Sequence, residues 1–211
     1  MPAALARGQR LPYPSPMSLA DRLYLARLRA RDESAFEELV RTEGDRVYSL
    51  VLRLVADRAE AEDIAQEVFV TVFKSIDTFR GESKLSTWVL RIAANHAKNR
   101  IKYLSRRAND GGGLENASEQ ALADLGKAPV SSHQRAPDQL LEAAESRSAL
   151  ERAIGKLDED HRLVVILRDV EELSYEEICE ITGLPEGTVK SRLHRARSAL
   201  KHLLLPGGGA P

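Results

Sequence analysis

The sequence has few of the residues on which disulfide frameworks, metal centres and membrane spans depend. Its 211 residues include one cysteine, which excludes a disulfide framework and a multi-cysteine zinc site and suits a reducing compartment. No apolar run reaches the roughly 18 residues of a transmembrane helix. The proline-rich first 16 residues lack the long apolar run of a secretory signal and read as a disordered leader.

Aromatic residues are also scarce, at 5% of the chain, whereas Leu, Ala, Glu and Arg are plentiful. This composition favours helix over sheet. No segment alternates apolar and polar residues between turn signals, so no sheet is expected. Four residue pairs have or approach capping-box spacing before apolar residues at helical period: Ser18 with Asp21, Ser34 with Glu37, Asp57 with Glu60, and Ser174 with Glu177. The sequence therefore predicts an all-α protein.

The helical pattern is interrupted between residues 105 and 137, where Gly, Pro and Ser gather and apolar residues hold no steady face. Such a composition is typical of a flexible linker. We expect two small helical domains, at 18–104 and 138–205. A disordered leader (1–17) and a disordered Gly/Pro-rich tail (206–211) would flank them.

The formal net charge of −1 would by itself argue against a nucleic-acid-binding protein, but the distribution of the charges along the chain reverses that argument. Basic residues dominate two stretches, 91–107 and 185–203, whereas acidic residues dominate 57–67. Segregated charge predicts separate surfaces for separate partners. On composition alone, however, the acidic stretch could be an ordinary solvated helix face.

The last predicted helix has the pattern of a DNA-reading helix. Val189, Leu193, Ala196 and Leu200 share one apolar face, which leaves the basic residues on the other side. A short capped helix and a turn containing Gly183 precede it, as in a helix-turn-helix, and Pro185 is a plausible first-turn proline. A solvated cationic face is the alternative, but the combined pattern favours the major groove.

A second basic stripe follows Ser86, where Arg91, Asn95, Lys98 and Lys102 recur at helical spacing. Cations beside an amide and nearby aromatic residues suit single-stranded or opened DNA. Trp88 lies near the same face, although for this residue alone a place in the core is the simpler interpretation.

These segments carry a family resemblance. The run 61–69, the loop 79–83 (Phe-Arg-Gly-Glu-Ser) and the run 86–99 resemble region 2 of bacterial sigma factors. The runs 157–162, 173–178 and 184–197 resemble region 4. Both blocks occur in the family's order and cover most of residues 18–205. The chain therefore resembles the sigma-70 family, in its extracytoplasmic-function (ECF) group and near RpoE-like members.

The resemblance implies a role for each matched position, including a core polymerase-docking role for the acidic stretch. Contacts with the −10 promoter element are expected from Phe79, Arg80, Lys84, Trp88, Arg91, Asn95, Lys98, Asn99 and Lys102. Contacts with the −35 element are expected from Lys190, Ser191, Arg192, His194, Arg195 and Arg197. Docking on core RNA polymerase is expected from Asp63, Gln66, Glu67 and Phe69. Asn95 matches the position that helps to capture a flipped −10 base, beside Phe79.

The implied partners are core RNA polymerase, through its β′ clamp helices and β flap, promoter DNA and an anti-sigma factor. The implied function is promoter recognition and opening in a bacterial stress response. The protein would be cytoplasmic, or held at the inner membrane by the anti-sigma factor. We expect no cofactor and no metal. Free sigma should bind promoter DNA poorly, because each basic face is small and the net charge is near zero.

Two other function classes fit the sequence less well. An enzyme is disfavoured, because the five histidines have no metal-ligand spacing and no phosphate loop or nucleophile elbow is present. A response regulator with a similar C-terminal helix-turn-helix would need alternating strands and helices in its N-terminal part. Cys179 stands where the helix-turn-helix usually has Ala, which predicts a small buried side chain rather than a redox sensor. Met17, rather than Met1, could be the start of the natural chain.

Overall fold

The computed structural model describes residues 17–109 and 137–205, and all the regular elements in these ranges are helices. The N-terminal half contains α1 (Leu19–Arg29), α2 (Glu33–Val55), α3 (Arg58–Ser75), the short 3₁₀ helix η1 (Ile76–Thr78) and α4 (Leu85–Asn109). The C-terminal half contains α6 (Pro137–Gly155), α7 (Glu159–Val165), the π-helical turn η2 (Ile166–Val170), α8 (Tyr175–Thr182) and α9 (Glu186–Leu204). The predicted all-α class is confirmed for the part of the chain that the structure describes.

Three of the four predicted helix starts are confirmed. Capping boxes form between Ser18 and Asp21 and between Ser174 and Glu177, and Asp57 caps α3. The predicted start at Ser34 is wrong, because Asp32 caps α2 by accepting the Ala35 N–H at 2.9 Å. A carboxylate is favoured over a hydroxyl at the positive end of a helix, and the Ser34 hydroxyl donates to that carboxylate.

The N-terminal half is a bundle in which α2, α3 and α4 bury one face of each helix. Val47, Ile64 and Leu90 are fully buried at its centre. Val40 of α2 and Phe73 of α3 lie outside this core and are each 45% exposed. The Phe73 ring packs against the Phe36 ring in a tilted arrangement, with 4.8 Å between the ring centroids, so the two form an aromatic pair near the surface.

The C-terminal half forms the expected helix-turn-helix. The apolar face of α9 that the sequence predicts is buried in full. Gly183 ends α8 in the left-handed conformation, with φ of 70°, which glycine adopts without steric cost. Pro185 is the N-cap of α9 and not a residue of its first turn.

The predicted domain boundary at residue 104 falls inside α4, which continues to Asn109. Met17 was assigned to the leader, yet its side chain packs against the core. The remainder of the predicted leader, most of the linker, and the tail lie outside the described residues. Among the described helices, none combines the length and the apolarity needed to cross a membrane.

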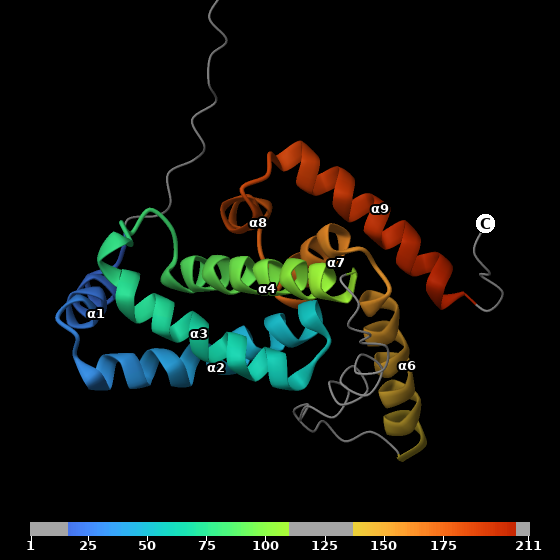
Figure 1. Cartoon of the computed structure of the whole chain (residues 1–211), viewed down its shortest axis with the longest axis horizontal. Helices are drawn as coiled ribbons and strands as arrows, with labels where there is room; N and C mark the ends of the chain where they lie inside the picture. Colours follow the sequence, from blue (N-terminus) through green and yellow to red (C-terminus); the bar gives the residue numbers. More distant parts are fainter. Residues whose placement is uncertain (1–16, 110–136, 206–211) are drawn as a thin grey trace, which may run out of the picture.

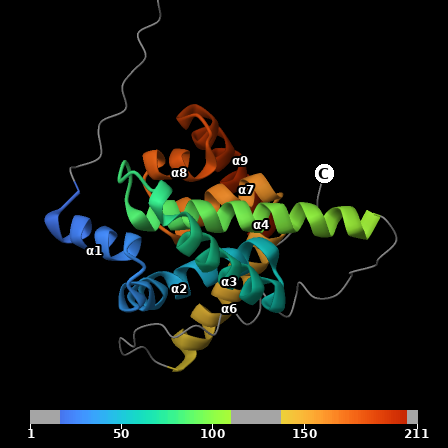
Figure 2. The same cartoon turned by 60° about the vertical axis from the view of Figure 1, so that its left-hand side comes forward.

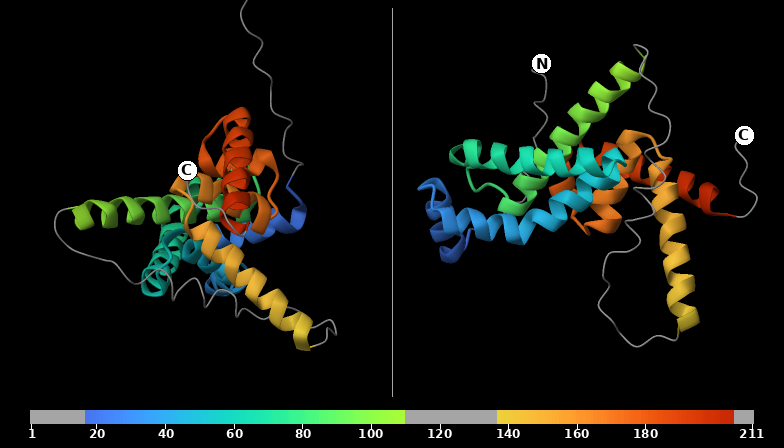
Figure 3. Two further views of the ribbon diagram at one scale, coloured as in Figure 1. Left: turned by 90° about the vertical axis from the view of Figure 1, so that its right-hand side faces the viewer. Right: turned by 60° about the horizontal axis from the view of Figure 1, so that its bottom comes forward.

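The two halves pack together around α4. This helix lies between the α2–α3 pair on one side and α8 and α9 on the other (Figures 1 and 2), while α6 projects away from the bundle (Figure 3). Arg46 pairs with Glu171 at 2.6 Å, and Arg53 pairs with the buried Glu151 at 3.2 Å. Arg162 of α7 donates to the Leu54 carbonyl at 2.7 Å. The interface between the halves is therefore rich in ion pairs and charge-assisted hydrogen bonds.

Candidate functional site

The basic stripe predicted to bind the −10 element lies along α4. Arg91, Asn95, Asn99 and Lys102 are exposed, as is Arg80 in the loop before the helix. Lys98 shares the helical spacing but is half-buried, because its ammonium pairs with Asp160 of α7 at 3.1 Å. Cations and amides thus follow one another along one helix face, as a nucleic-acid strand requires.

Phe79 and Trp88, the two aromatic residues expected at this surface, are more buried than the exposed cations. Phe79 is only 4% exposed, and its ring lies 5.4 Å from that of the half-buried Trp88. Arg29 donates to the Phe79 carbonyl at 2.6 Å, which fixes the start of the loop. In this conformation Phe79 is a core residue that supports Trp88, so its own side chain is not presented to a ligand.

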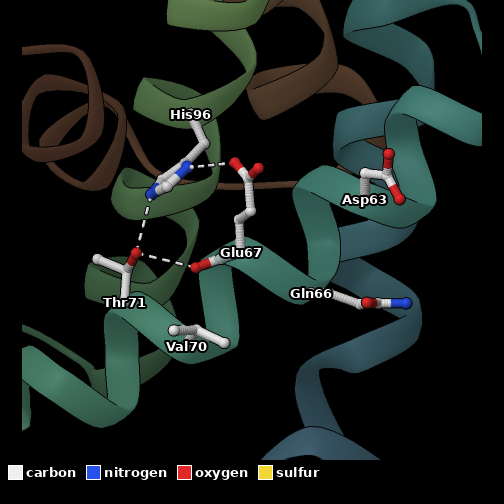
Figure 4. A pocket seen from close by; sticks show the side chains of 6 residues that line it. All are labelled: Asp63, Gln66, Glu67, Val70, Thr71 and His96. Carbon is white, nitrogen blue, oxygen red and sulfur yellow. Dashed lines mark hydrogen bonds and ion pairs between the residues drawn. The ribbon is translucent and has the colours of Figure 1, made fainter.

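The acidic face of α3 surrounds an open pocket of about 400 Å³. Asp63, Gln66 and Glu67 line it and are exposed. Val70, Thr71 and His96 complete the lining (Figure 4). Phe69, the fourth residue expected to dock on polymerase, is half-buried, packs against the core and does not line this pocket.

Glu67 is held in place by a set of contacts that the sequence did not predict. Its carboxylate lies 3.4 Å from Nδ1 of His96, and the Thr71 hydroxyl contacts the other ring nitrogen at 3.0 Å (Figure 4). The Arg100 guanidinium lies 3.1 Å from the same carboxylate. Arg100 also pairs with Glu60. The spacing of these residues in the sequence is compatible with such contacts. Glu60 and Glu67 are two turns apart and share one face of α3, while His96 and Arg100 are one turn apart and share one face of α4.

The predicted −35 residues lie on the exposed side of α9. Ser191, His194 and Arg195 are exposed. Lys190 lies over the Tyr175 ring at 5.2 Å, and its pairing with Glu186 raises the pKa of its ammonium. Arg197 pairs with Asp169 of η2 and is also exposed. Five of the six predicted cationic or polar groups are therefore open to a ligand.

Arg192 is the exception on α9. Its guanidinium is half-buried and lies 2.8 Å from the Asp160 carboxylate. Asp160 also holds Lys98 of α4, so one carboxylate joins a predicted −35 residue to a predicted −10 residue. The sequence pattern does not predict this bridge, because it depends on how the two halves pack.

Two further acidic residues of α8 face the beginning of α4. Glu177 pairs with Lys84 at 3.0 Å. Burial raises the pKa of Glu180, and a hydrogen bond with Ser83 and the positive charge of Arg91 oppose that rise. The N-terminal part of the basic stripe therefore lies against carboxylates from the C-terminal half.

Cys179, the single cysteine of the chain, is half-buried and packs against the core. Burial and three neighbouring carboxylates raise the pKa of its thiol. A raised pKa disfavours the reactive thiolate, so the environment is that of a small apolar side chain. In residues 17–109 and 137–205, no three potential ligands among His, Cys, Asp and Glu gather at one point.

Comparison with known proteins bears on both halves. The family descriptions "Sigma-70 region 2" and "Sigma-70, region 4" match residues 39–107 and 147–200. The chain is 36% identical over 190 residues to the ECF RNA polymerase sigma-E factor of Escherichia coli, covering 89% of this chain and 96% of that one. It is 35% identical over 186 residues to the RNA polymerase sigma-H factor of Pseudomonas aeruginosa, covering 88% and 94%.

Two solved structures have the same fold. The sigma factor RpoE of Bartonella quintana, in complex with the anti-sigma factor NepR, matches with a TM-score of 0.62 and 24% identity, covering 80% of this chain and 96% of that chain. CnrH in complex with the cytosolic domain of CnrY matches with a TM-score of 0.60 and 24% identity, covering 88% and 97%. The response-regulator alternative finds no support, since residues 17–109 form helices without a strand.

Proposed function

The chain belongs to the sigma-70 family of RNA polymerase sigma factors, in the ECF group, and on this premise we propose how its surfaces divide the work of transcription initiation. The observation that carries the proposal is the segregation of charge onto distinct helices. An acidic face lies on α3, a basic stripe lies on α4, and a second basic face lies on α9. Each face suits a different partner.

The α9 face binds duplex DNA at the −35 element. Arginine offers paired donors to guanine edges in the major groove, and lysine neutralises phosphate. Arg195 and Ser191 are exposed for base contacts, while Lys190, His194 and Arg197 flank them. Arg192 joins this surface once it exchanges the Asp160 carboxylate for DNA.

The α4 face binds the opened strand of the −10 element. Arg80, Lys84, Arg91, Lys98 and Lys102 would track the phosphates, and Asn95 and Asn99 would read base edges. A flipped base is held between a planar side chain and polar groups, for which Trp88 is the available aromatic ring. Phe79 contributes by supporting Trp88, since the two rings are in contact.

The α3 face docks on core RNA polymerase at the β′ clamp helices. Asp63, Gln66 and Glu67 are exposed around the pocket, and Arg100 and His96 hold Glu67 in place. Phe69 supports this helix from its inner side. The exposed leucines at the end of α9 (Leu203, Leu204 and Leu205) are available to the β flap. The polymerase supplies the bond chemistry, so this chain is not itself an enzyme.

We extend the proposal to regulation by an anti-sigma factor. Of the two solved structures described above, one is a complex of a sigma factor with the anti-sigma factor NepR, and the other is a complex of CnrH with the cytosolic domain of CnrY. The protein would then act in the bacterial cytoplasm during a stress response, and a membrane-bound anti-sigma factor would retain it at the inner membrane until the stress signal arrives.

Two substitutions test the DNA-binding roles separately. Arg195→Ala should weaken binding to −35 DNA by about 1–3 kcal/mol and relax the sequence preference at that element. Promoter complexes that do form with this variant should still melt the DNA at the −10 element. Asn95→Ala should spare −35 binding and reduce permanganate-detected melting. Arg107→Ala, at an exposed cation on the face of α4 opposite the stripe, is the control. Unchanged melting in Asn95→Ala would show that the −10 assignment is wrong.

A further inference from the structure

His96 of α4 contacts two residues of α3 at the acidic face, one with each nitrogen of its ring. Its Nε2 lies 3.0 Å from the Thr71 hydroxyl, and its Nδ1 lies 3.4 Å from the Glu67 carboxylate (Figure 4). The Thr71 hydroxyl also donates to the backbone carbonyl of Glu67 at 2.8 Å. All three residues line the pocket beside Asp63 and Gln66. The ring therefore links α4 to a residue that the proposed function assigns to polymerase docking.

The hydrogen bonds of Thr71 decide which ring nitrogen of His96 carries a proton. A threonine hydroxyl has a single proton to donate, and Thr71 donates it to the carbonyl one turn before it, as threonines inside helices often do. The hydroxyl can then only accept from the ring, so the hydrogen-bond network assigns a proton to Nε2. A neutral imidazole has one ring proton, which leaves its Nδ1 as an acceptor.

The contact between His96 and Glu67 consequently changes sign with the charge of the ring. When the ring is neutral, Nδ1 faces the carboxylate as one acceptor against another. When the ring gains a second proton, it becomes a cation, and the same two groups form an ion pair. Histidine is the side chain that ordinarily makes this change between about pH 5 and pH 8.

The other charged groups around the pocket hold Glu67 in a way that does not change over this range. The Arg100 guanidinium on α4 lies 3.1 Å from the Glu67 carboxylate, and arginine keeps its proton throughout. On α3, Asp63 lines the pocket, and Glu60 pairs with Arg100. The Glu67 side chain is 52% exposed, so its contacts with α4 decide how it is presented to a partner. The part of this restraint that depends on pH comes from His96.

We propose that His96 is a proton-dependent positioning residue for docking on core RNA polymerase: it holds Glu67 only while its ring carries both protons, so docking strengthens on the acid side of neutrality. This inference rests on the proposed function of the α3 face. A carboxylate that is fixed before docking loses less conformational entropy when the complex forms. Neither the segregation of charge nor the Arg100 ion pair would make docking respond to pH in this way.

The first experiment measures the affinity of the full-length chain for bacterial core polymerase, without DNA, at about pH 6 and about pH 8. His96→Gln retains an N–H for the Thr71 hydroxyl and cannot gain a charge. Relative to this variant, the unaltered chain should gain about twofold to fivefold in affinity at the lower pH, as an exposed ion pair allows. His202→Gln, at an exposed histidine near the end of α9, is the control and should respond to pH as the unaltered chain does. An equal pH response of the unaltered chain and His96→Gln would overturn the positioning role.

The second experiment locates the ring proton by nitrogen NMR of the free, unaltered chain, with the His96 signals identified by their absence from His96→Gln. Near pH 8 the proton should reside on Nε2. Thr71→Val removes the hydroxyl that accepts this proton, so in that variant the neutral ring should instead carry its proton on Nδ1, facing Glu67. A proton on Nδ1 in the unaltered chain would contradict the proposal.

The two levels of the argument fail in different ways. If the chain binds core polymerase but His96→Gln does not alter the pH response, only the positioning role is wrong. If the chain binds core polymerase at neither pH, the proposed function of the α3 face itself fails.

Discussion

Arg162 of α7 offers the sharpest test of how the C-terminal half is joined to the rest of the protein. Its guanidinium donates to three backbone carbonyls: Leu54 at 2.7 Å, Gly155 at 2.6 Å and Leu157 at 2.8 Å. Leu54 is in the last turn of α2, and Gly155 is the last residue of α6. Carbonyls at helix ends lack partners within the helix, and a cation there also interacts favourably with the helix dipole. Arg162 therefore caps two helices at once.

Replacing this residue by methionine keeps the apolar part of the side chain and removes all three donors. A hydrogen bond to a charged group is worth about 1.5–3 kcal/mol, and such contributions are not additive within one residue. Because the side chain is half-buried, water can reach part of the site and compensate some of the loss. We expect Arg162→Met to lower the free energy of unfolding by about 3 kcal/mol.

Urea unfolding followed by two signals can locate that loss. The chain has one tryptophan, Trp88 on α4, so its fluorescence reports on the N-terminal half, whereas circular dichroism reports on all helices. In Arg162→Met the circular dichroism transition should begin at lower urea than the fluorescence transition. Arg152→Met, at an exposed residue with one hydrogen bond of 3.3 Å to the Ser148 carbonyl, is the control and should change stability by less than about 0.5 kcal/mol. A loss below about 1 kcal/mol in Arg162→Met would refute the capping argument.

Three other outcomes are expected. Gly183→Ala should lower the free energy of unfolding by about 1 kcal/mol in a thermal melt, because alanine is strained at a φ of 70° even though no atom lies near the added Cβ. Gly187→Ala, inside α9, should leave stability unchanged or raise it, and equal effects of the two substitutions would contradict this reasoning. Hydrogen bonds from Ser34, the Ala35 N–H and Arg27 lower the pKa of Asp32 to about 2. Its stabilising contribution is therefore present above its unfolded-state pKa of about 4 and is lost as the pH falls through 2, so Asp32→Asn should flatten the stability profile between these values. Arg100→Ala should weaken core polymerase binding about fivefold in a competition assay because Glu67 loses a partner, with Arg106→Ala as the unaffected comparison.

The features that sequence predicted well depend on neighbours along the chain. The capping boxes at Ser18 and Ser174 and the buried face of α9 follow from spacing within one helix. The start of α2 was misplaced by two residues because Asp32 and Ser34 are both good caps, and only the geometry shows which one accepts the Ala35 N–H.

The features that sequence missed join residues far apart in the chain. Arg162 donates to a carbonyl 108 positions away, and Lys98 meets Asp160 across 62 positions. Nothing in the local pattern of either segment distinguishes these contacts from a solvated charge. The end of α4 was also missed, because the polar residues after Leu104 continue the helix without an apolar face to mark it.

The central claim, that this chain directs polymerase to a two-part promoter, is tested most directly by run-off transcription with bacterial core polymerase. The template would be a library randomised at the −10 and −35 positions. The account predicts transcripts that depend on the protein and are enriched for two motifs at fixed spacing, and Arg195→Ala should relax only the −35 motif. Absence of transcripts together with absence of binding to core polymerase would contradict the account.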